Sequence, residues 1–418
     1  MTGTIGVIGA GVSGLTAAHL LATRHDVVLF EADDRLGGHA HTHDLTAEDG
    51  RPVPVDTGFL VHNERTYPNL LRLFAELGVT TRDTEMSMSV RCEGCGLEYA
   101  GARKLAGLFP TAATARNGRY LRMLAQVPRF HREANRLLDD PAADPGTTLG
   151  EFLARGGHSR YFTEHFALPL VSAVWSTERG LAERYPARYL FHFLRNHGML
   201  SVGGSPAWRT VVGGSGEYVR RIAERLPAVR SSTPVRSVHP RADGVDVRDH
   251  ADVVHRVDRV VLATHADQAL GLLAEPTERQ RRVLGAFGYS DNETLLHTDP
   301  GPLPDHARAS WNYLKPGCAG GSGAVRVSYD LNRLMRLAEP VDYVVTLNGA
   351  DRVAPDRVLA KMQYRHPVYT PESVAAQRDL PGIGDERVRF AGAYHGWGFH
   401  EDGCASGVRA AEAMGVRW

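Results

Sequence analysis

A glycine-rich turn between a buried strand and a helix, close to the start of the chain, constrains the fold most strongly. Residues 5–10 are all apolar or glycine, as in a strand buried on both faces of a parallel sheet. The pattern Gly9-x-Gly11-x-x-Gly14 follows, and the spacing of leucines and alanines predicts a helix over 13–23. A second strand is predicted over 26–31. These features predict a βαβ unit whose right-handed crossover makes the two strands parallel neighbours.

The glycine spacing in this unit is suited to binding a dinucleotide. Gly9 permits the tight turn, Gly11 lets the backbone approach a pyrophosphate, and Gly14 lets the helix pack closely on the strand. Free N–H groups and the helix dipole then face the phosphates. Glu31 lies 22 residues after Gly9, where a carboxylate can accept hydrogen bonds from ribose hydroxyls. The alternative is a glycine-rich turn with a purely structural role. The cofactor contacts expected from this unit are Gly9, Gly11, Val12, Ser13, Gly14, Glu31 and Ala32.

A second glycine-rich segment lies at the other end of the chain. Residues 389–403 have the pattern of a strand and a glycine-rich turn, and a helix is predicted from Asp402 towards Met414. Two such segments indicate a long, two-ended cofactor, and FAD is the leading candidate. The second helix would present N–H groups to the flavin pyrimidine ring, whose N1–C2 edge becomes more negative on reduction. Further cofactor contacts are expected from other segments of the chain, namely Arg35, Gly37, Gly38, His39, Gly58, Val235, Ala263, Thr264, Gly392, Gly398, Phe399, Asp402 and Gly403.

The order of strand and helix patterns predicts an α/β fold in which two domains alternate along the chain. A doubly wound, Rossmann-like FAD-binding domain is expected from residues 1–75, 205–266 and 384–418. An inserted substrate domain is expected from residues 76–204, which read as mainly helical, and 267–383, which read as mixed strands. The strands expected within 207–265 have a parallel-type pattern.

Composition excludes some classes of partner. The chain has 418 residues, 43% hydrophobic and 23% charged, with a formal net charge of zero. These values are typical of a globular protein, and nucleic-acid binding is not expected. We find no signal-peptide pattern and no apolar run of the ~20 residues that span a bilayer, so a cytoplasmic location is expected.

The segment 103–138 has an unusual charge balance. Eight of its residues are lysine or arginine and one, Glu133, is acidic, with aromatic and aliphatic residues interleaved. One interpretation is a basic amphipathic surface in peripheral contact with anionic membrane lipid. The other is an ordinary solvated helical face of a cap domain.

Two cysteine and histidine patterns were considered as metal sites. Cys92-x-x-Cys95 has no matching second pair, so a four-thiolate zinc site is not supported. We interpret it as a turn between strands over 87–91 and 97–99. The alternating histidines of 39–43 are interpreted as a strand beside a cofactor loop. No metal site is therefore predicted.

Together, the glycine fingerprint, Glu31, the Arg35-x-Gly37-Gly38 motif and the Gly392 segment resemble the flavin amine oxidase superfamily, which includes protoporphyrinogen oxidases and phytoene-desaturase-like enzymes. More narrowly, the chain resembles a bacterial group of predicted FAD/NAD-binding oxidoreductases associated with cyclopropane fatty acid synthases. The resemblance covers essentially the whole chain and is carried by residues 56–59, 63–69, 173–176, 196–198, 208–211, 263–270, 296–299, 310–313 and 398–403. It implies FAD and a two-domain flavoprotein, and its association suggests chemistry on fatty acyl chains.

The expected function is FAD-dependent dehydrogenation, or desaturation, of a C–C bond in a fatty-acyl or other lipidic substrate, with hydride transfer to flavin N5. His400 and Glu401 are the candidate catalytic residues because they lie at the predicted flavin face. Acids in the first turn of a helix also serve as capping groups, which is the alternative for Glu401. Candidate substrate-lining residues, for which core packing is the alternative role, are Trp175, Trp311, Tyr313, Tyr394 and Trp397.

Three other functions remain open at this level. The first is a flavin amine oxidase, although the C-terminal turn has Tyr394 and Trp397 and no clear pair of tyrosines. The second is a redox-neutral, flavin-dependent isomerase that moves a double bond. The third is a non-catalytic flavoprotein that acts as the partner of a lipid methyltransferase.

Overall fold

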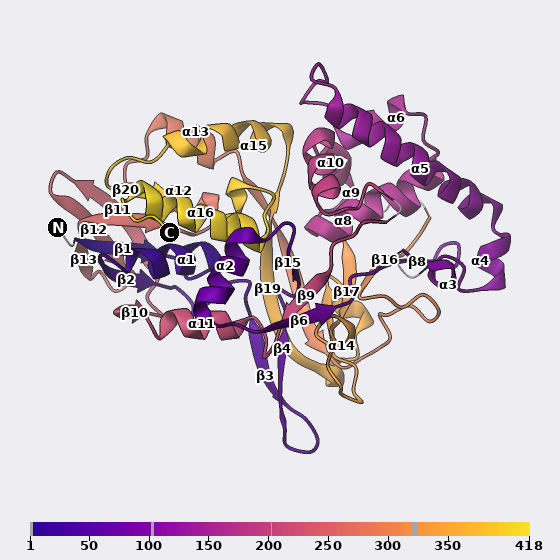
Figure 1. The fold of residues 1–418 in the computed structure, drawn as a ribbon, viewed down its shortest axis with the longest axis horizontal. Coiled ribbons are helices and arrows are strands. Elements are labelled where there is room, and N and C mark those ends of the chain that lie inside the picture. The colour runs from indigo at the N-terminus through magenta and orange to yellow at the C-terminus, as the bar shows by residue number, and fades with distance from the viewer. Residues whose placement is uncertain (1–2, 102–103, 202, 319–323) are drawn as a thin grey trace.

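The computed structural model describes residues 3–101, 104–201, 203–318 and 324–418. A five-stranded parallel sheet in the order β10-β2-β1-β14-β20 lies on the left of the view in Figure 1. Its strands are β1 (Thr4–Ile8), β2 (Asp26–Phe30), β10 (Ala228–Arg230), β14 (Arg259–Leu262) and β20 (Val388–Phe390). Strands β1 and β2 pair in parallel from Thr4 opposite Asp26 to Ile8 opposite Phe30. The predicted βαβ unit is therefore confirmed.

The side chains of this sheet alternate between two hydrophobic cores. Ile5 and Val7 of β1 face a core shared with four helices, whereas Ile8 faces a second core on the other side. The helices of the first core are α1 (Val12–Leu21), α2 (Pro68–Leu77), α11 (Gly216–Ala223) and α16 (His400–Ala413). This alternation follows from the two-residue period of a strand and buries the sheet on both faces.

An antiparallel sheet and two helices cover the second face. The sheet consists of β11 (Val235–Arg241), β12 (Gly244–Asp249) and β13 (Val254–Val257), and α12 (Ala266–Leu272) and α13 (Glu278–Leu284) pack beside it. The pairing of β11, β12 and β13 is antiparallel. The expectation of parallel-type strands throughout 207–265 is therefore wrong for these three, because short hairpin connections join them.

A seven-stranded sheet forms the second large layer, in the order β19-β15-β18-β17-β16-β7-β8. All its pairs are antiparallel except β16 with β7. Its strands are β7 (Met88–Cys92), β8 (Leu97–Gly101), β15 (Gly288–His297), β16 (Trp311–Lys315), β17 (Arg326–Asp330), β18 (Val344–Leu347) and β19 (Val358–Val368). The two longest strands, β15 and β19, are not among those predicted from the sequence.

A helical layer lies above β16 and β8 in Figure 1. It packs around an aromatic-rich core that includes Phe130, Phe152, Phe162 and Phe191. Its segments are α3 (Lys104–Leu108), α4 (Ala112–Arg116), α5 (Gly118–Asp139), α6 (Leu149–Arg155), α7 (Arg160–Phe162), the π-helical turn η1 (Thr163–Ala167), α8 (Leu168–Trp175), α9 (Arg179–Arg184) and α10 (Ala187–Asn196). Among the described residues, none of the helices combines the length and apolar character that crossing a bilayer requires.

Two small sheets and several short helices connect these layers. Strands β3 (Thr42–Thr46) and β4 (Pro52–Asp56) form a ribbon, and β9 (Trp208–Val211) pairs with β5 (His62–Asn63) and β6 (Thr81–Thr84). The remaining short helices are α14 (Leu331–Leu334), α15 (Pro371–Ala376), η2 (Ala350–Arg352), η3 (Pro355–Arg357), η4 (Gln377–Gly382) and η5 (Ala393–His395). The α/β class with a Rossmann-like parallel sheet is confirmed, and the division into five segments stays a prediction.

Candidate cofactor and active site

A cavity of about 810 Å³ is lined by residues of both sheets and of the helical layer. The N-terminal ends of α1 and α16 contribute to it, as do the residues that follow β2 and β14. Ligands of parallel α/β sheets bind at the carboxyl ends of the strands, and this cavity occupies that position.

The loop before α1 fits a pyrophosphate group. Gly11 is the N-cap of α1, and no side chain caps the helix. Gly11, Val12 and Ser13 line the cavity, and a Cβ added to Gly11 would find no atom within 4 Å. Free N–H groups and open space therefore meet at a helix N-terminus, which is an anion-binding arrangement. Gly14 differs, because its added Cβ would lie 1.8 Å from the Gly9 carbonyl oxygen.

Glu31 and the Arg35–Gly38 loop lie beside this helix end. Oε2 of Glu31 accepts a hydrogen bond of 2.7 Å from the Ala10 N–H, so the carboxylate is held at the end of β2 and lines the cavity. Arg35 Nη1 donates to the Gly38 carbonyl oxygen at 2.8 Å. A Cβ on Gly38 would lie 3.2 Å from the Gly11 Cα, so the two glycine loops are in close contact. This arrangement places a ribose acceptor and a cation next to the proposed phosphate position.

The C-terminal segment adds the second helix N-terminus. Phe399 is the N-cap of α16 and no side chain caps the helix, while Asp402 accepts a hydrogen bond of 3.0 Å from the Phe399 N–H. A Cβ on Gly403 would lie 2.6 Å from Val12 Cγ1, so α16 crosses the start of α1 too closely for a larger residue at this position. Segments from opposite ends of the chain thus build one site.

Buried polar atoms in the cavity wall have no partner among the described residues. They are His39 Nε2, His265 Nδ1, Trp311 Nε1 and Tyr394 Oη. Buried polar groups are nearly always hydrogen-bonded, so these atoms fit a cavity that takes a polar ligand. Together with the two uncapped helix ends and the open space at Gly11, the residues fit FAD.

The structure brings most of the predicted site residues to this cavity. Those that line it are Gly9, Gly11, Val12, Ser13, Glu31, Ala32, Arg35, Gly38, His39, Gly58, Val235, Ala263, Thr264, Gly392, Gly398, Phe399, His400, Trp175, Trp311 and Tyr394. Those that do not are Gly14, Gly37, Asp402, Gly403, Glu401, Tyr313 and Trp397. In the second group the glycines serve close backbone packing, as the short Cβ distances at Gly14, Gly37 and Gly403 show.

The two catalytic candidates have different surroundings. His400 lines the cavity, stacks on Phe59 with ring centroids 3.8 Å apart, and places Nε2 3.2 Å from Tyr218 Oη. Burial lowers the pKa of His400 to about 3, so its ring is neutral at ordinary pH. Glu401 does not line the cavity. Its carboxylate accepts hydrogen bonds from the N–H groups of Asn69 and Leu70, so it caps α2, and the geometry does not support the predicted catalytic role.

Two predicted substrate-lining residues belong to the packing behind the wall. The Trp397 carbonyl oxygen accepts a hydrogen bond of 3.0 Å from Trp175 Nε1, and the Trp397 ring packs on the helical core. Tyr313 packs between this core and that of the seven-stranded sheet. Both therefore hold wall residues in place instead of facing the cavity.

Sequence reasoning missed the contribution of β19. Tyr364 and His366 line the cavity, and their rings lie 5.1 and 5.3 Å from that of His39. Burial lowers the pKa of His366 to about 4, so this cluster is neutral. Residues two apart on a strand share a face, so the spacing of Tyr364 and His366 could have indicated that both face the same side. That inference required the strand over 358–368 to be predicted first.

The part of the cavity bordered by the helical layer is mainly apolar, with Ser176 and His197 as its polar members. Its wall consists of side chains from α8, α10, β9, β16 and nearby segments, namely Met86, Val174, Trp175, Phe193, Met199, Trp208, Trp311 and Tyr329. We call these eight residues the apolar wall. Among the described lining residues, the only carboxylates are Glu31 and Asp33, which lie beside β2. This distribution separates a polar, nucleotide-like region from a hydrophobic one.

The parallel sheet, the uncapped helix ends and the divided cavity define a dinucleotide-dependent oxidoreductase fold. The chain belongs to the family of flavin containing amine oxidoreductases, whose model matches residues 12–308. The predicted family, the FAD cofactor and the assignment as an FAD-dependent oxidoreductase are thereby confirmed.

Individual relatives are more distant. A stretch of 40 residues is 58% identical to the flavin-dependent L-tryptophan oxidase RebO of Lentzea aerocolonigenes, which is 9% of this chain and 8% of that protein. A redesigned putrescine oxidase has a similar fold, with a TM-score of 0.71 and 16% identity over 99% of this chain and 98% of that one. So does a CLA-producing fatty acid isomerase from P. acnes, with a TM-score of 0.68 and 15% identity over 97% of both chains.

Proposed function

We propose that the enzyme dehydrogenates a C–C bond of a fatty-acyl or other lipidic substrate. The observation that carries this proposal is the apolar wall, which has no carboxylate among the described lining residues. An amine substrate is cationic at neutral pH and favours a carboxylate, which this wall lacks, whereas an acyl chain needs only apolar surface. The aromatic rings of the wall suit a cation and an acyl chain alike, so the lack of a carboxylate is what favours the acyl substrate. When bound, FAD supplies a two-electron acceptor for hydride from carbon.

The contribution of the chain itself is orientation and exclusion of water. The Trp175 indole is held by its hydrogen bond to the Trp397 carbonyl oxygen. Phe193 and Phe399 stack with ring centroids 4.8 Å apart, and Phe193 also stacks on His197. A wall of mutually packed rings can hold an acyl chain in one position at low entropic cost.

We also propose that His400 positions its neighbours and is not a general base. A base whose pKa is lowered to about 3 is poorly matched to proton abstraction near neutral pH. Its stacking on Phe59 and its contact with Tyr218 Oη keep the start of α16 in place. Loss of two hydrogens sends a hydride from one carbon to the flavin and a proton from the adjacent carbon to solvent or another cavity group, and the weakly basic His400 is not that proton acceptor.

The proposal is tested by anaerobic flavin reduction. The purified flavoprotein is mixed with oleate and other acyl lipids, and separately with putrescine and L-tryptophan, and flavin absorbance is followed with product analysis by mass spectrometry. We expect bleaching by an acyl lipid and a product two hydrogens lighter. Bleaching by the amines alone would replace the proposal with amine oxidation. A shifted double bond with the flavin still oxidised after turnover would identify a redox-neutral isomerase.

A substitution in the apolar wall sharpens this test. Met86→Glu places a carboxylate in the wall, so acyl-dependent reduction should slow at least tenfold, about 1.4 kcal/mol. Leu105→Glu is the matched control, because Leu105 is 72% exposed on α3 and does not line the cavity. Equal acyl-dependent rates in the two variants, both with full flavin content, would contradict an acyl site at this wall.

We further propose that the basic face of α4 and α5 contacts anionic lipid. Arg116, Arg119, Arg122, Arg129, Arg132 and Arg136 are all exposed there, and Leu121 of α5 is exposed among them. Exposed cations with apolar neighbours suit the surface of an anionic membrane. Co-sedimentation with phosphatidylglycerol vesicles but not with phosphatidylcholine vesicles supports the contact. A protein that sediments with neither kind of vesicle, or equally with both, contradicts it.

A further inference from the structure

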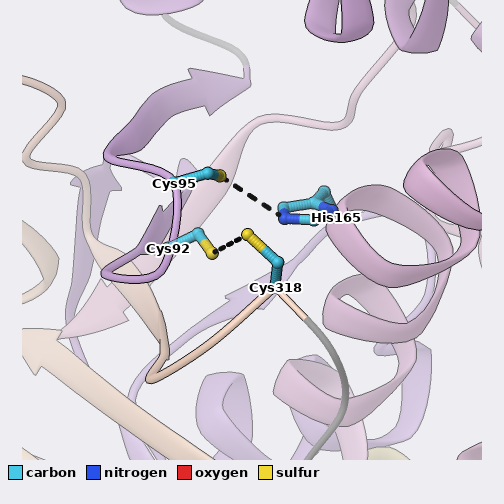
Figure 2. A group of neighbouring side chains, drawn as sticks. All are labelled: Cys92, Cys95, His165 and Cys318. Carbon is cyan, nitrogen blue, oxygen red and sulfur yellow. Dashed lines mark hydrogen bonds between the residues drawn. The ribbon is translucent and has the colours of Figure 1, made fainter.

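Three cysteines and one histidine from separate parts of the chain meet outside the cavity (Figure 2). The ligand atoms of Cys92, Cys95, His165 and Cys318 all lie within 4.8 Å of one another. Cys92 Sγ is 3.8 Å from Cys318 Sγ, and Cys95 Sγ is 3.7 Å from His165 Nε2. None of the four residues lines the cofactor cavity.

The spacing of these atoms matches a tetrahedral metal site. With Zn–S bonds of about 2.3 Å and Zn–N bonds of about 2.0 Å, a regular tetrahedron has S···S edges of roughly 3.8 Å and S···N edges of roughly 3.5 Å. The separations of 3.8 Å between the Cys92 and Cys318 sulfurs and 3.7 Å between Cys95 Sγ and His165 Nε2 are close to these values. A disulfide between Cys92 and Cys318 would require about 2.05 Å between the sulfurs, and it would leave Cys95 and His165 without a role.

The turn between β7 and β8 is shaped to present two sulfurs on one side. The backbone N–H of Cys95 is directed at the Cys92 sulfur, and the N–H of Leu97 is directed at the Cys95 sulfur. A Cβ on Gly94 would lie 2.6 Å from the backbone nitrogen of Cys318, so only glycine lets the third cysteine approach this closely.

The histidine is held in the orientation that a metal ligand needs. His165 Nδ1 lies 3.1 Å from the Tyr161 carbonyl oxygen, to which it donates when Nε2 carries the free lone pair. The Tyr161 ring stacks on the imidazole at 4.0 Å. Such a second contact fixes the tautomer and the ring plane of a ligating histidine.

A buried ion pair adjoins the cluster. Three thiolates and one Zn²⁺ leave a formal charge of −1. Lys315 is 6% exposed, directly precedes the loop to Cys318, and lies 2.8 Å from Glu164 of η1. Its ammonium group interacts electrostatically with both Cys318 and His165. The ion pair also ties β16 to the same helical turn that provides His165.

We propose that Cys92, Cys95, His165 and Cys318 bind one structural Zn²⁺ ion. Thiolate and imidazole ligands in a tetrahedron select zinc among the common divalent metals, and four protein ligands leave no open position for catalysis. The ion would join the β7–β8 turn, the loop after β16 and η1. Because η1 continues directly into α8, whose last residue is Trp175, the ion would anchor the helices behind the apolar wall.

The proposed zinc site differs from the sequence expectation of no metal site, which stays a prediction. That expectation relied on the lack of a second cysteine pair, but the remaining ligands are a lone cysteine 223 residues after Cys95 and a histidine in a helix. Pairing of β16 with β7, which places Lys315 opposite Cys92, brings Cys318 to the turn.

The first test measures metal in the intact flavoprotein, purified without chelator from cells grown with zinc. Elemental analysis should find about one zinc per chain. Removal of zinc under reducing conditions and addition of Co²⁺ should give the intense ligand-field bands of tetrahedral thiolate coordination, at wavelengths beyond the flavin absorption. Wild-type protein that contains no zinc, and whose reduced form binds neither metal, would overturn the proposal.

Variants assign the ligands. Cys318→Ser should weaken zinc binding by more than about 100-fold in a competition titration with a chromogenic chelator. Cys404→Ser is the matched control, since Cys404 lies on α16 beside Thr16 and outside the cluster, and it should retain full zinc. Zinc retention by Cys318→Ser would overturn the assignment. If that variant does not fold, Co²⁺ spectra and a count of free thiols in the wild-type protein distinguish a metal site from a Cys92–Cys318 disulfide. The disulfide would leave two free thiols in place of four.

Discussion

Replacing Gly14 by alanine should separate the packing role of the glycine fingerprint from its cofactor role. The added Cβ would lie 1.8 Å from the Gly9 carbonyl oxygen and 3.1 Å from the Ala263 Cβ. Carbon atoms in contact are about 3.5–4.0 Å apart, so α1 would have to move away from β1 by more than roughly 1 Å. The opposite side of α1 is also closed, because a Cβ on Gly407 of α16 would lie 2.4 Å from the Ser13 carbonyl oxygen.

The cost of this change follows from the lack of room on either side. Overpacking in a well-packed core costs about 1–3 kcal/mol, and a clash with backbone on both sides of a helix lies at or above the upper end. We therefore expect Gly14→Ala to lower the free energy of unfolding of the apoprotein by about 3 kcal/mol or more. FAD affinity should fall as well, since the N-terminus of α1 is displaced.

Gly11→Ala is the matched control. Its Cβ meets no atom within 4 Å, and its φ of −72° suits any residue. The apoprotein should lose no more than about 1 kcal/mol, which is the usual cost of alanine at an N-cap. The Cβ would project into the space next to Val12 and Ser13, so the FAD dissociation constant should rise at least tenfold, about 1.4 kcal/mol.

Two measurements decide between these outcomes. Urea unfolding of the apoproteins, followed by circular dichroism, gives the free energies, and quenching of flavin fluorescence gives the dissociation constants. Wild-type stability in Gly14→Ala would refute the close approach of α1 to β1. Wild-type FAD affinity in Gly11→Ala would refute the placement of the pyrophosphate at the start of α1.

Three further predictions concern the start of α16. Glu401→Ala should cost about 1–2 kcal/mol of stability through loss of the α2 cap, while the rate of flavin reduction per bound flavin stays at the wild-type value; a rate loss at full flavin content would restore Glu401 as a catalytic candidate. Burial raises the pKa of Asp402 to about 7, so the native state keeps this proton to higher pH than the unfolded chain. The free energy of unfolding should therefore fall as the pH rises from about 4 to 7, and Asp402→Asn should lack that part of the slope in denaturation curves at several pH values. Because the pKa of His400 is lowered to about 3, this residue should not contribute to the pH dependence of flavin reduction above pH 5. The wild-type protein and His400→Gln should therefore have pH profiles of the same shape in that range.

Local sequence was sufficient to predict the parts of the molecule whose contacts are close in the chain. The βαβ unit, the helix of the C-terminal segment and the β7–β8 turn all follow from patterns within about 30 residues, because propensity, glycine positions and hydrophobic period act locally. The same patterns placed Gly11, Glu31 and Gly38 at a cofactor, since the fingerprint brings its own residues together.

Strands and side chains whose positions depend on distant pairing partners could not be predicted from local sequence. Strands β15 and β19 are held by each other along ten residue pairs. In β15 the residues before Leu295 lack an apolar alternation, whereas Ala360, Met362 and Tyr364 of β19 alternate with polar residues. That alternation was a signal for β19, but the pairing with β15 decides which face of the strand meets the cavity. Glu401 illustrates the converse, because an acid at a helix start suits either a cofactor or a neighbouring helix, and α2 is the group it contacts.

The sequence by itself thus determined that a dinucleotide-binding unit forms, because each glycine acts on backbone a few residues away. FAD as its ligand followed from the second glycine-rich segment and from the family resemblance. Only the tertiary structure decided which residues surround the substrate and that Cys318 and His165 join Cys92 and Cys95. Those neighbours are 70 to more than 200 residues apart in the chain, and their meeting depends on the register of β16 on β7 and on the packing of the helical layer. Long-range contacts of this kind are set by how whole elements pack, which no local pattern specifies.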